Sequence, residues 1–419
     1  MCGIPGLWRG VVLLIIACLG PAVGGEIDGR DRELWNKAAV PYLQKNFRSE
    51  ADAYNGGHFL MVPLHAAFQK GEKAWQDDLG AQFKRITAQG TKAIAKTSLS
   101  RLQYLYLCSR FMTLANEAHR ADLIPPNLDG MLVQEIESVW TTEPDPHWNG
   151  TKFKGMRECV LAKLQVEAVG KSYYRAILDT ELHLMAIAAE LRHSELIAKR
   201  KRRNAGVIKD ALSVARQVFM QRAVPDREGR WRFQPGVWAD HPDFAYAGNG
   251  EKAVGLQPRK VENVAEDTGH SARMPMWLTS FAQAYPAKSA ERRYYEALKQ
   301  GFEKQFYEKV LVPPGPDMPA YRTTNFMDGR NGVYRWGYGA FAGKNEGYGP
   351  YEISGVLTLG WYSFLDSERM RAVYRHMATQ FPLPKQVETL YLGPGTTPGS
   401  RLGGIRELIV RLAAKLDPQ

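Results

Sequence analysis

A polar segment just ahead of an apolar stretch carries the residue types that proton transfer needs. Glu262–Arg273 is rich in acids and contains His270, with Glu266 and Asp267 close before it. We expect a helix to begin near His270 and to place Arg273 one turn further on. Because a histidine with a pKa of about 6.5 exchanges protons near neutral pH, His270 is a candidate general base. The alternative is a structural histidine beside a helix-capping acid.

Aromatic, arginine and asparagine residues alternate in a glycine-rich stretch further along the chain. It runs from Tyr321 to Tyr338 and continues from Asn345 to Tyr351. Sugar rings stack on the faces of Trp and Tyr, and arginine binds carboxylates through paired hydrogen bonds. The stretch therefore predicts a loop that binds an acidic sugar, and a surface loop pinned by its aromatic side chains is the alternative. Tyr54–His58 is a smaller polar loop, expected ahead of an apolar helix.

Signatures of several other chemistries are missing from the sequence. There is no His-Glu-x-x-His zinc motif, no Walker loop, no Gly-x-Ser-x-Gly nucleophile turn and no dinucleotide-binding glycine pattern on a strand. We therefore expect no metal and no cofactor. Beyond the amino-terminal segment the only cysteines are Cys108 and Cys159, which form either one disulfide or two buried thiols.

Apolar residues recur with a period close to 3.6 over most of the chain, which predicts helices, whereas strand signals are scarce. Gly170 is expected to divide or kink the longest of these patterns. Long loops rich in Gly, Pro, Trp and Asn separate the patterns, and such loops are usually functional. We expect an all-α fold of helical hairpins closed into a ring, an α/α toroid with long functional loops, with a plain helical bundle as the alternative. The expected helices are Phe59–Ala88, Leu99–Arg120, Met131–Trp140, Cys159–Lys199, Ala205–Gln221, His270–Tyr285, Ser289–Val310, Ile353–Ser367, Glu368–Gln380 and Ile405–Leu416.

Residues 1–24 have the three parts of a secretory signal. Arg9 supplies a positive charge, Val11–Leu19 an apolar run, and Ala22–Gly24 small residues for a signal peptidase. The run is shorter than the roughly 20 apolar residues that span a bilayer. We expect a secreted or periplasmic protein in which residues 25–419 form a single domain. A lipid anchor at Cys18 is a second option, because the preceding Ile-Ile-Ala resembles a lipobox.

The charge of the chain bears on its partners. The formal net charge is +11, and removal of a signal containing Arg9 lowers it by one. A basic exported protein favours a polyanionic partner such as an acidic polysaccharide, and export makes nucleic acid an unlikely one. The alternative is a surplus of charge spread over the surface for solubility. No second apolar run is long enough to span a membrane in the mature chain.

Taken together, these segments resemble a group of exported enzymes. Glu266–Arg273 opening an apolar helix, followed by the Tyr/Arg/Gly loop, resembles the α/α-toroid polysaccharide lyases that cut alginate or glucuronan. Arg175–His183 and Gly347–Tyr351 share this likeness. The Asn-Asn-His motif of the better-known helical alginate lyases is absent, and Tyr54–His58 is a loose echo of it.

The resemblance implies β-elimination on a chain of uronic acids. Positive or hydrogen-bonding groups neutralise the substrate carboxylate, a base removes the C5 proton, and an acid protonates the departing glycosidic oxygen. We expect His270 as base or neutraliser, Tyr334 as acid or acid/base, and Arg330 as a third catalytic residue that holds a carboxylate. A neighbouring arginine would lower the tyrosine pKa from about 10. The residues expected to bind substrate are Asn55, His58, Arg273, Arg335, Trp336, Tyr338 and Tyr348, and the acid could also be Tyr321, Tyr338 or Tyr348.

Two other functions fit the same sequence. An α/α-toroid glycoside hydrolase needs two carboxylates about 5 to 10 Å apart, one of them protonated. Glu266 or Asp267 could supply one, and the other would come from Asp328, Glu346 or Glu352. A non-catalytic exported protein could instead use the aromatic loops only to bind sugar.

Overall fold

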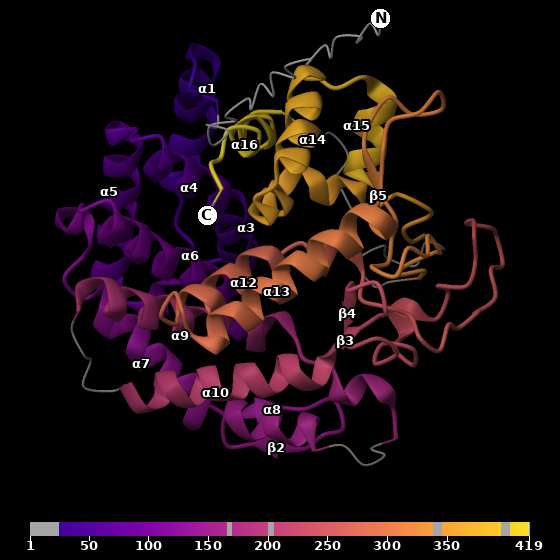
Figure 1. Ribbon diagram of the computed structural model, residues 1–419, viewed down its shortest axis with the longest axis horizontal. Helices are drawn as coiled ribbons and strands as arrows, with labels where there is room; N and C mark the ends of the chain where they lie inside the picture. The colour runs from indigo at the N-terminus through magenta and orange to yellow at the C-terminus, as the bar shows by residue number, and fades with distance from the viewer. Residues whose placement is uncertain (1–24, 166–169, 200–204, 338–345, 395–402, 419) are drawn as a thin grey trace, which may run out of the picture.

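The computed structural model of the chain describes residues 25–165, 170–199, 205–337, 346–394 and 403–418 (Figure 1). This part is mostly helical, which confirms the all-α prediction. None of its helices is both long enough and apolar enough to cross a bilayer. The predicted signal segment 1–24, with Cys18, lies outside the described residues.

The α-helices are α1 Gly29–Leu34, α2 Val40–Leu43, α3 Glu50–Phe59, α4 Met61–Gln69, α5 Lys73–Gln89, α6 Ser98–Glu117, α7 Leu128–Thr141, α8 Met156–Leu164, α9 Asp179–Ala198, α10 Ala205–Arg222, α11 Thr268–Ser271, α12 Met274–Gln283, α13 Ala290–Gln305, α14 Glu368–Thr379, α15 Lys385–Leu392 and α16 Ile405–Ala413.

The core is built around α6 and α9, which pack against each other along much of their length. Every residue of α6 from Ser100 to Ala115 is buried, and so is every residue of α9 from Glu181 to Leu191. A helix buried on all sides must be surrounded by other elements. On α6 lies α3, and on α9 lies α12, so that α3, α6, α9 and α12 form one continuous series.

A second set of helices covers this series. In Figure 1, α10 lies along α9 and α13 along α12, and both contacts are extensive. The buried residues of α13 are few and include Tyr295, Phe302 and Gln305, which share one face of the helix. The covering helices are therefore amphipathic, whereas α6, α9 and α12 are buried over most of their length.

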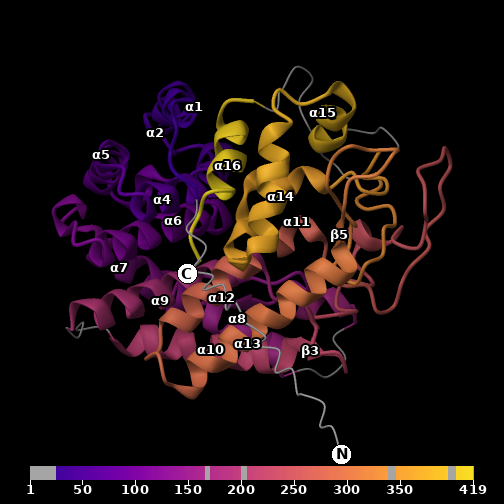
Figure 2. The same cartoon turned by 45° about the horizontal axis from the view of Figure 1, so that its top comes forward.

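The carboxyl-terminal helix closes the structure against the amino-terminal part. Figure 2 shows α16 between α1 and α14, and it packs on both as well as on α4. Ion pairs fix this contact: Arg30 with Glu407 at 2.9 Å, and Arg411 with Asp31 at 2.7 Å. The chain therefore brings residues from both of its ends to the same region.

The strands of the described chain form short antiparallel hairpins. This small strand content agrees with the scarcity of strand signals in the sequence. β1 (Asp145–Pro146) pairs with β2 (Lys152–Phe153), and β3 (Ala223–Pro225) pairs with β4 (Trp231–Phe233), Val224 lying opposite Arg232. β5 (Leu311–Val312) pairs with β6 (Arg322–Thr323). The remaining regular elements are the π-helices Trp35–Ala39 and Phe306–Val310 and the 3₁₀ helices Thr91–Ala93, Ala121–Leu123, Ser172–Arg175, Pro242–Phe244, Ser354–Leu359 and Trp361–Leu365.

Glycines with positive φ interrupt several of the predicted helices. Gly170, with φ of 83°, separates α8 from the segment that leads into α9, as expected. The pattern predicted as one helix over Phe59–Ala88 is divided into α4 and α5, with Gly71 at φ 65° between them. Ile353–Ser367 was predicted to be helical throughout but forms two 3₁₀ helices on either side of Gly360, which has φ of 76°. Left-handed φ values favour glycine and end a right-handed helix.

The prediction of a loop at Tyr54–His58 is wrong, because these residues lie inside α3. Ser49 caps the helix by accepting a hydrogen bond from the Asp52 backbone N–H at 3.0 Å. The glycines allow close packing on α6: a Cβ at Gly57 would lie 2.6 Å from Cγ and 2.7 Å from the backbone oxygen of Gln103. Gly56 and Gly57 resemble a loop signal in the sequence, but in the structure they allow α3 to pack closely against its neighbours.

The two cysteines of the described chain are separate thiols. Cys108 lies in α6 and Cys159 in α8, and both are buried and free. Burial raises the pKa of each thiol. Of the two alternatives in the sequence, the structure has the pair of buried thiols.

Candidate functional site

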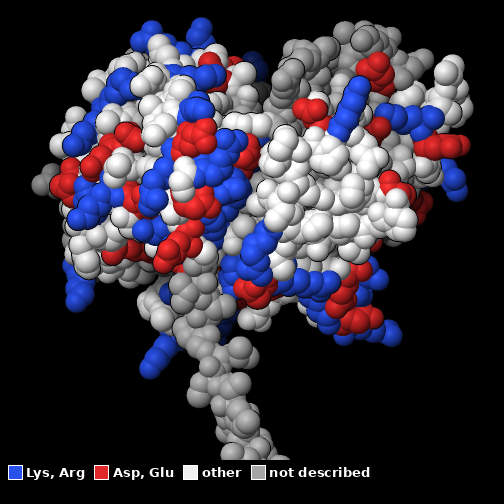
Figure 3. All heavy atoms as spheres, turned by 90° about the horizontal axis from the view of Figure 1, so that it is seen from above, with Lys and Arg blue, Asp and Glu red and all other residues white. Residues whose placement is uncertain are grey.

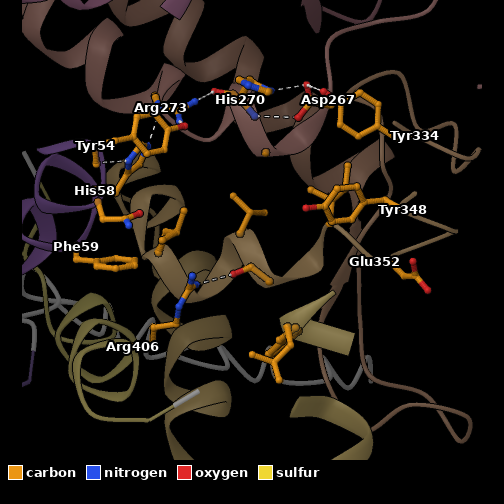
Figure 4. A pocket seen from close by; sticks show the side chains of 18 of the residues that line it. Tyr54, His58, Phe59, Asp267, His270, Arg273, Tyr334, Tyr348, Glu352 and Arg406 are labelled. Carbon is orange, nitrogen blue, oxygen red and sulfur yellow. Dashed lines mark hydrogen bonds and ion pairs between the residues drawn. The ribbon is translucent and has the colours of Figure 1, made fainter. Parts of the chain in front are cut away.

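The largest concentration of candidate residues surrounds a cavity of about 530 Å³ (Figure 4). Its wall is formed by α3, the α11 turn, the loop that carries Tyr334 and Tyr348, and the start of α16. His270 and Tyr334 therefore face a common cavity although they are far apart in the sequence, as the sequence analysis expected.

The α11 turn presents His270 through a local cap. Asp267 precedes the helix and accepts a hydrogen bond from the His270 backbone N–H at 3.0 Å. The same side chain reaches the imidazole, with 2.6 Å between Asp267 Oδ2 and His270 Nδ1. Because a carboxylate accepts, Nδ1 carries the proton and Nε2 is the nitrogen left for chemistry. The His270 side chain is 31% exposed and Asp267 only 4%, so the imidazole is the accessible member.

Tyr334 joins this pair through Asp267. Its hydroxyl donates to Asp267 Oδ2 at 3.0 Å, and its side chain is buried. Two backbone hydrogen bonds with Tyr348, at 2.9 and 2.7 Å, hold the loop in place. Gly347 makes that pairing feasible, because a Cβ there would lie 2.8 Å from the Tyr334 backbone oxygen. One carboxylate thus positions both predicted proton-transfer residues.

Burial and neighbouring charges shift the pKa values of Asp267, His270 and Tyr334 in different directions. Burial would lower the pKa of His270, but the Asp267 and Asp179 carboxylates outweigh it and raise the pKa above 6.5. Burial would raise the pKa of Asp267, but His270 and Arg335 outweigh it and lower the pKa. Burial and the Asp267 charge raise the pKa of Tyr334 well above 10. Arg335, whose Cζ lies 5.1 Å from the centre of the ring, does lower this pKa, but burial and the Asp267 charge outweigh it. The expected net lowering of the tyrosine pKa is therefore wrong.

Arg273 organises the wall next to His270. Its Nε donates to His58 Nε2 at 2.8 Å and its Nη2 to the Tyr54 hydroxyl at 2.6 Å, while Nη1 pairs with Asp179 at 2.8 Å. His58 must then carry its proton on Nδ1, which donates to the Tyr54 carbonyl at 2.8 Å. Burial and the nearby Arg273 charge lower the pKa of His58, so it stays neutral. The Tyr54 hydroxyl accepts from Arg273, and its own proton has no acceptor among the described residues.

A second cavity, of about 350 Å³, adjoins the first. Both cavities are lined by Asp267, His270, Tyr334 and Arg335, so they meet at the residues of the proton-transfer cluster. The second has an aromatic wall that includes Trp148, at the turn between β1 and β2, which is 44% exposed. Exposed aromatic faces next to charged groups suit the apolar face of a sugar ring. The other aromatic residues of that wall are Trp238, His241 and Phe244.

Glu266 lines the second cavity and is held protonated. It accepts from Gln234 Nε2 at 3.3 Å and from the Ser271 hydroxyl at 3.2 Å. Burial and the neighbouring Asp179 and Asp267 charges raise its pKa to about 8. At neutral pH the site therefore contains an uncharged carboxylic acid close to an ionised one.

The structure brings most of the predicted residues to the first cavity but not all. Trp336 lies outside both cavities beside Tyr246, with 6.4 Å between the rings. Arg330 lines a separate hollow and pairs with Asp328, so it is not placed near His270. Tyr338 lies outside the described residues. The predicted residues on the first cavity are Asn55, His58, His270, Arg273, Tyr334, Arg335 and Tyr348.

Several residues on the cavities were not selected from the sequence. Tyr54 lies in the same polar cluster, Tyr54–His58, from which Asn55 and His58 were predicted to bind substrate. Its hydroxyl group could therefore have been predicted as a site residue from the sequence. Asp179 lies within Arg175–His183, one of the segments that share the likeness to the lyases. Trp148 lies in Glu143–Gly155, one of the long loops rich in Gly, Pro, Trp and Asn, so the loop was a usable signal. Arg406 carries no local signal, since an isolated basic residue is common on a protein surface.

One group of side chains elsewhere has the spacing of metal ligands. Potential ligand atoms of Asp145, Cys159 and Glu181 lie within 4.8 Å of one another. Lys163 already pairs with Glu181 at 2.5 Å, and burial raises the pKa of the Cys159 thiol. A thiol that keeps its proton beside a resident ammonium group is a poor ligand set for a cation.

Comparison of the chain with protein-family models, with curated proteins and with solved structures found no match. On the face shown in Figure 3, blue and red side chains are intermixed rather than separated into one basic patch.

Proposed function

We propose that this protein is an exported polysaccharide lyase that cleaves a uronic acid polymer, such as alginate or glucuronan, by β-elimination. The supporting observation is the hydrogen-bonded chain Tyr334–Asp267–His270 at a cavity that also contains arginines. The fold we propose is an α/α toroid, supported by the series α3, α6, α9 and α12 with other helices packed outside it. Cleavage of such a polymer would take place outside the cytoplasm.

His270 is the proposed base. Its Nε2 removes the C5 proton, the electrons of that C–H bond form the C4–C5 double bond, and the C4–O bond breaks. Asp267 holds the imidazole in the tautomer that leaves Nε2 free and stabilises the imidazolium that forms. A base of this kind works in its neutral form, so activity should rise as pH passes through the His270 pKa.

A tyrosine is the proposed acid for the departing oxygen. Tyr334 keeps its proton at neutral pH because its pKa is raised, but it donates to Asp267. Tyr54 faces the same cavity, and accepting from Arg273 leaves its own proton available to a substrate oxygen. Both tyrosines remain candidates for this role.

The substrate carboxylate needs a partner while charge builds on C5. Arg273 and Arg335 each pair with an aspartate, and their charges still raise the local potential. Glu266, neutral at pH 7, can donate a hydrogen bond to that carboxylate, which an ionised glutamate cannot. Together these groups favour the enolate-like transition state.

Glu266 also supports a second candidate, a glycoside hydrolase. A carboxylic acid with a pKa of about 8 is suited to protonate a glycosidic oxygen. The second carboxylate is harder to assign. Asp267 is occupied by His270 and Tyr334, and Glu352 pairs with Lys252 at 2.7 Å. We therefore favour the lyase.

Product analysis separates the two reactions. Purified protein should be incubated with alginate, glucuronan, hyaluronan and pectate, and both ultraviolet absorbance and reducing ends should be followed. A lyase creates a double bond, so absorbance rises with each new reducing end on at least one polymer. Reducing ends without absorbance would indicate a hydrolase, and binding with neither product would indicate a sugar-binding protein.

A further inference from the structure

One partly buried cation of the first cavity differs from the other arginines on its wall. Arg406 lies in the first turn of α16 and faces the cavity from the side opposite His270 (Figure 4). It belongs to the carboxyl-terminal segment, which the function proposed above does not use.

The guanidinium of Arg406 has no carboxylate partner among the described residues. Its Nη1 donates to the Thr358 hydroxyl and lies 3.5 Å from the Gly355 carbonyl oxygen. Its Cζ lies 5.1 Å from the centre of the Phe59 ring. Nε and Nη2 make no hydrogen bond to any described residue.

The other two arginines on this wall are neutralised. Arg273 pairs with Asp179 at 2.8 Å, and Arg335 pairs with Asp243 at 2.8 Å. The acid next to Arg406 in the sequence, Glu407, is turned away and pairs with Arg30 at 2.9 Å. The positive charge at this end of the cavity is therefore not balanced by the described part of the chain.

This arrangement is unfavourable without a ligand. Burial lowers the pKa of Arg406 to about 10, which still leaves it charged at neutral pH. A cation in the first turn of a helix also opposes the helix dipole. The ion pairs of α16 with α1 hold in place the helix that carries Arg406. An anion in the cavity would remove both costs, and a guanidinium with two free donors matches a carboxylate.

We propose that Arg406 binds the carboxylate of a second uronic acid residue, in the same polymer chain as the one whose C5 proton faces His270. This inference rests on the lyase function proposed above, because it adds a recognition site for the same substrate. It makes the cavity selective for polymers with charges on neighbouring sugars. Phe59 beside the guanidinium offers an apolar surface to that ring.

The test compares acidic and neutral trisaccharides. Binding should be measured by calorimetry in a His270→Ala background, so that nothing is cleaved, using glucuronate and mannuronate trisaccharides. Cellotriose is the matched neutral probe, since it is the glucuronate trisaccharide without its carboxylates. Arg406→Met should weaken binding of the better acidic trisaccharide at least tenfold and leave cellotriose unchanged. The matched control is Arg227→Met, which removes an exposed arginine that lines neither cavity and should change neither affinity.

A melting temperature distinguishes a ligand site from a structural one. Because Arg406 is a partly buried charge with no carboxylate partner among the described residues, Arg406→Met should melt at the same temperature as the parent or higher. A lower melting temperature with equal loss of acidic and neutral binding would overturn the inference, as would the absence of binding by either acidic trisaccharide.

The inference and the lyase function can fail separately. If Arg406→Met loses affinity for acidic trisaccharides but no polymer yields unsaturated product, the Arg406 site stands and the lyase does not. If the protein is a lyase and Arg406→Met retains the KM of the parent, the lyase stands and the Arg406 site is refuted.

Discussion

At the scale of single residues, Asp267 joins the two side chains on which the proposed chemistry depends. Its Oδ2 atom accepts one hydrogen bond from His270 Nδ1 and another from the Tyr334 hydroxyl. The carboxylate raises the pKa of His270 against the effect of burial. Removing the charge of Asp267 should therefore alter the rate and its pH dependence together.

The variant Asp267→Asn tests this role with little risk to the fold, because asparagine is also a good helix cap. We expect kcat to fall by about 10²-fold or more, since the amide no longer fixes the imidazole or stabilises its cation. The pKa of His270 should fall, so the acidic limb of the kcat/KM profile should move to lower pH. Asp77→Asn, at an exposed aspartate, is the control. An unchanged profile would show that Asp267 does not act through His270.

The sequence was most informative where chemistry is local. Asp267 and His270 lie within one turn of a helix start, so their contact follows from spacing and capping. Arg330 shows the opposite case. Its position in an aromatic loop suited a carboxylate-binding arginine as well as that of Arg335 did. In the structure, however, a short turn brings its guanidinium to Asp328, away from His270. Which arginines of a loop face a cavity depends on how the loop packs, and spacing does not determine that.

At the scale of elements, the contact between α3 and α6 positions the wall that carries Tyr54 and His58. Gly57 lies at the closest approach, with no room for a side chain. Helical periodicity predicted α6 well, because its apolar pattern is long. It missed α3, because two glycines in a helix are explained only by the neighbouring helix. For the same reason no local pattern could show that α16 contributes to the cavity.

The variant Gly57→Ala should separate α3 from α6. The added methyl group would overlap the Gln103 backbone, and we expect a loss of about 1 to 3 kcal/mol in unfolding free energy together with reduced activity. Chemical denaturation provides the measurement. Gly130→Ala in α7 is the matched control, because a Cβ there meets nothing within 4 Å. That variant should be as stable as the parent or slightly more so. Equal stability of the two variants would contradict the packing argument.

At the scale of the whole molecule, the protonated Glu266 makes stability depend on pH. Its pKa is about 8 in the folded protein against 4.5 as the ordinary value. The folded state therefore binds more protons than the unfolded state between these values, and stability falls as pH rises through this range. The raised pKa of His270 acts in the same direction above 6.5.

Glu266→Gln replaces the protonated acid by a neutral group of the same shape. We expect it to match the parent near pH 4.5 and to be more stable at pH 8, by up to about 4 kcal/mol. Thermal melting across this pH range shows the difference. Parallel curves for the two proteins would mean that Glu266 is ionised in the folded state, which would remove it as a hydrogen-bond donor to substrate.

The central claim is that an imidazole fixed by a buried aspartate takes a proton from a sugar carbon. Its most direct test records unsaturated product and reducing ends in one digest, with the wild type and His270→Ala side by side and circular dichroism to verify the fold. The account predicts equal molar amounts of both products from the wild type and neither from the variant. Chain cleavage without the double bond, or a fully active His270→Ala, would contradict it.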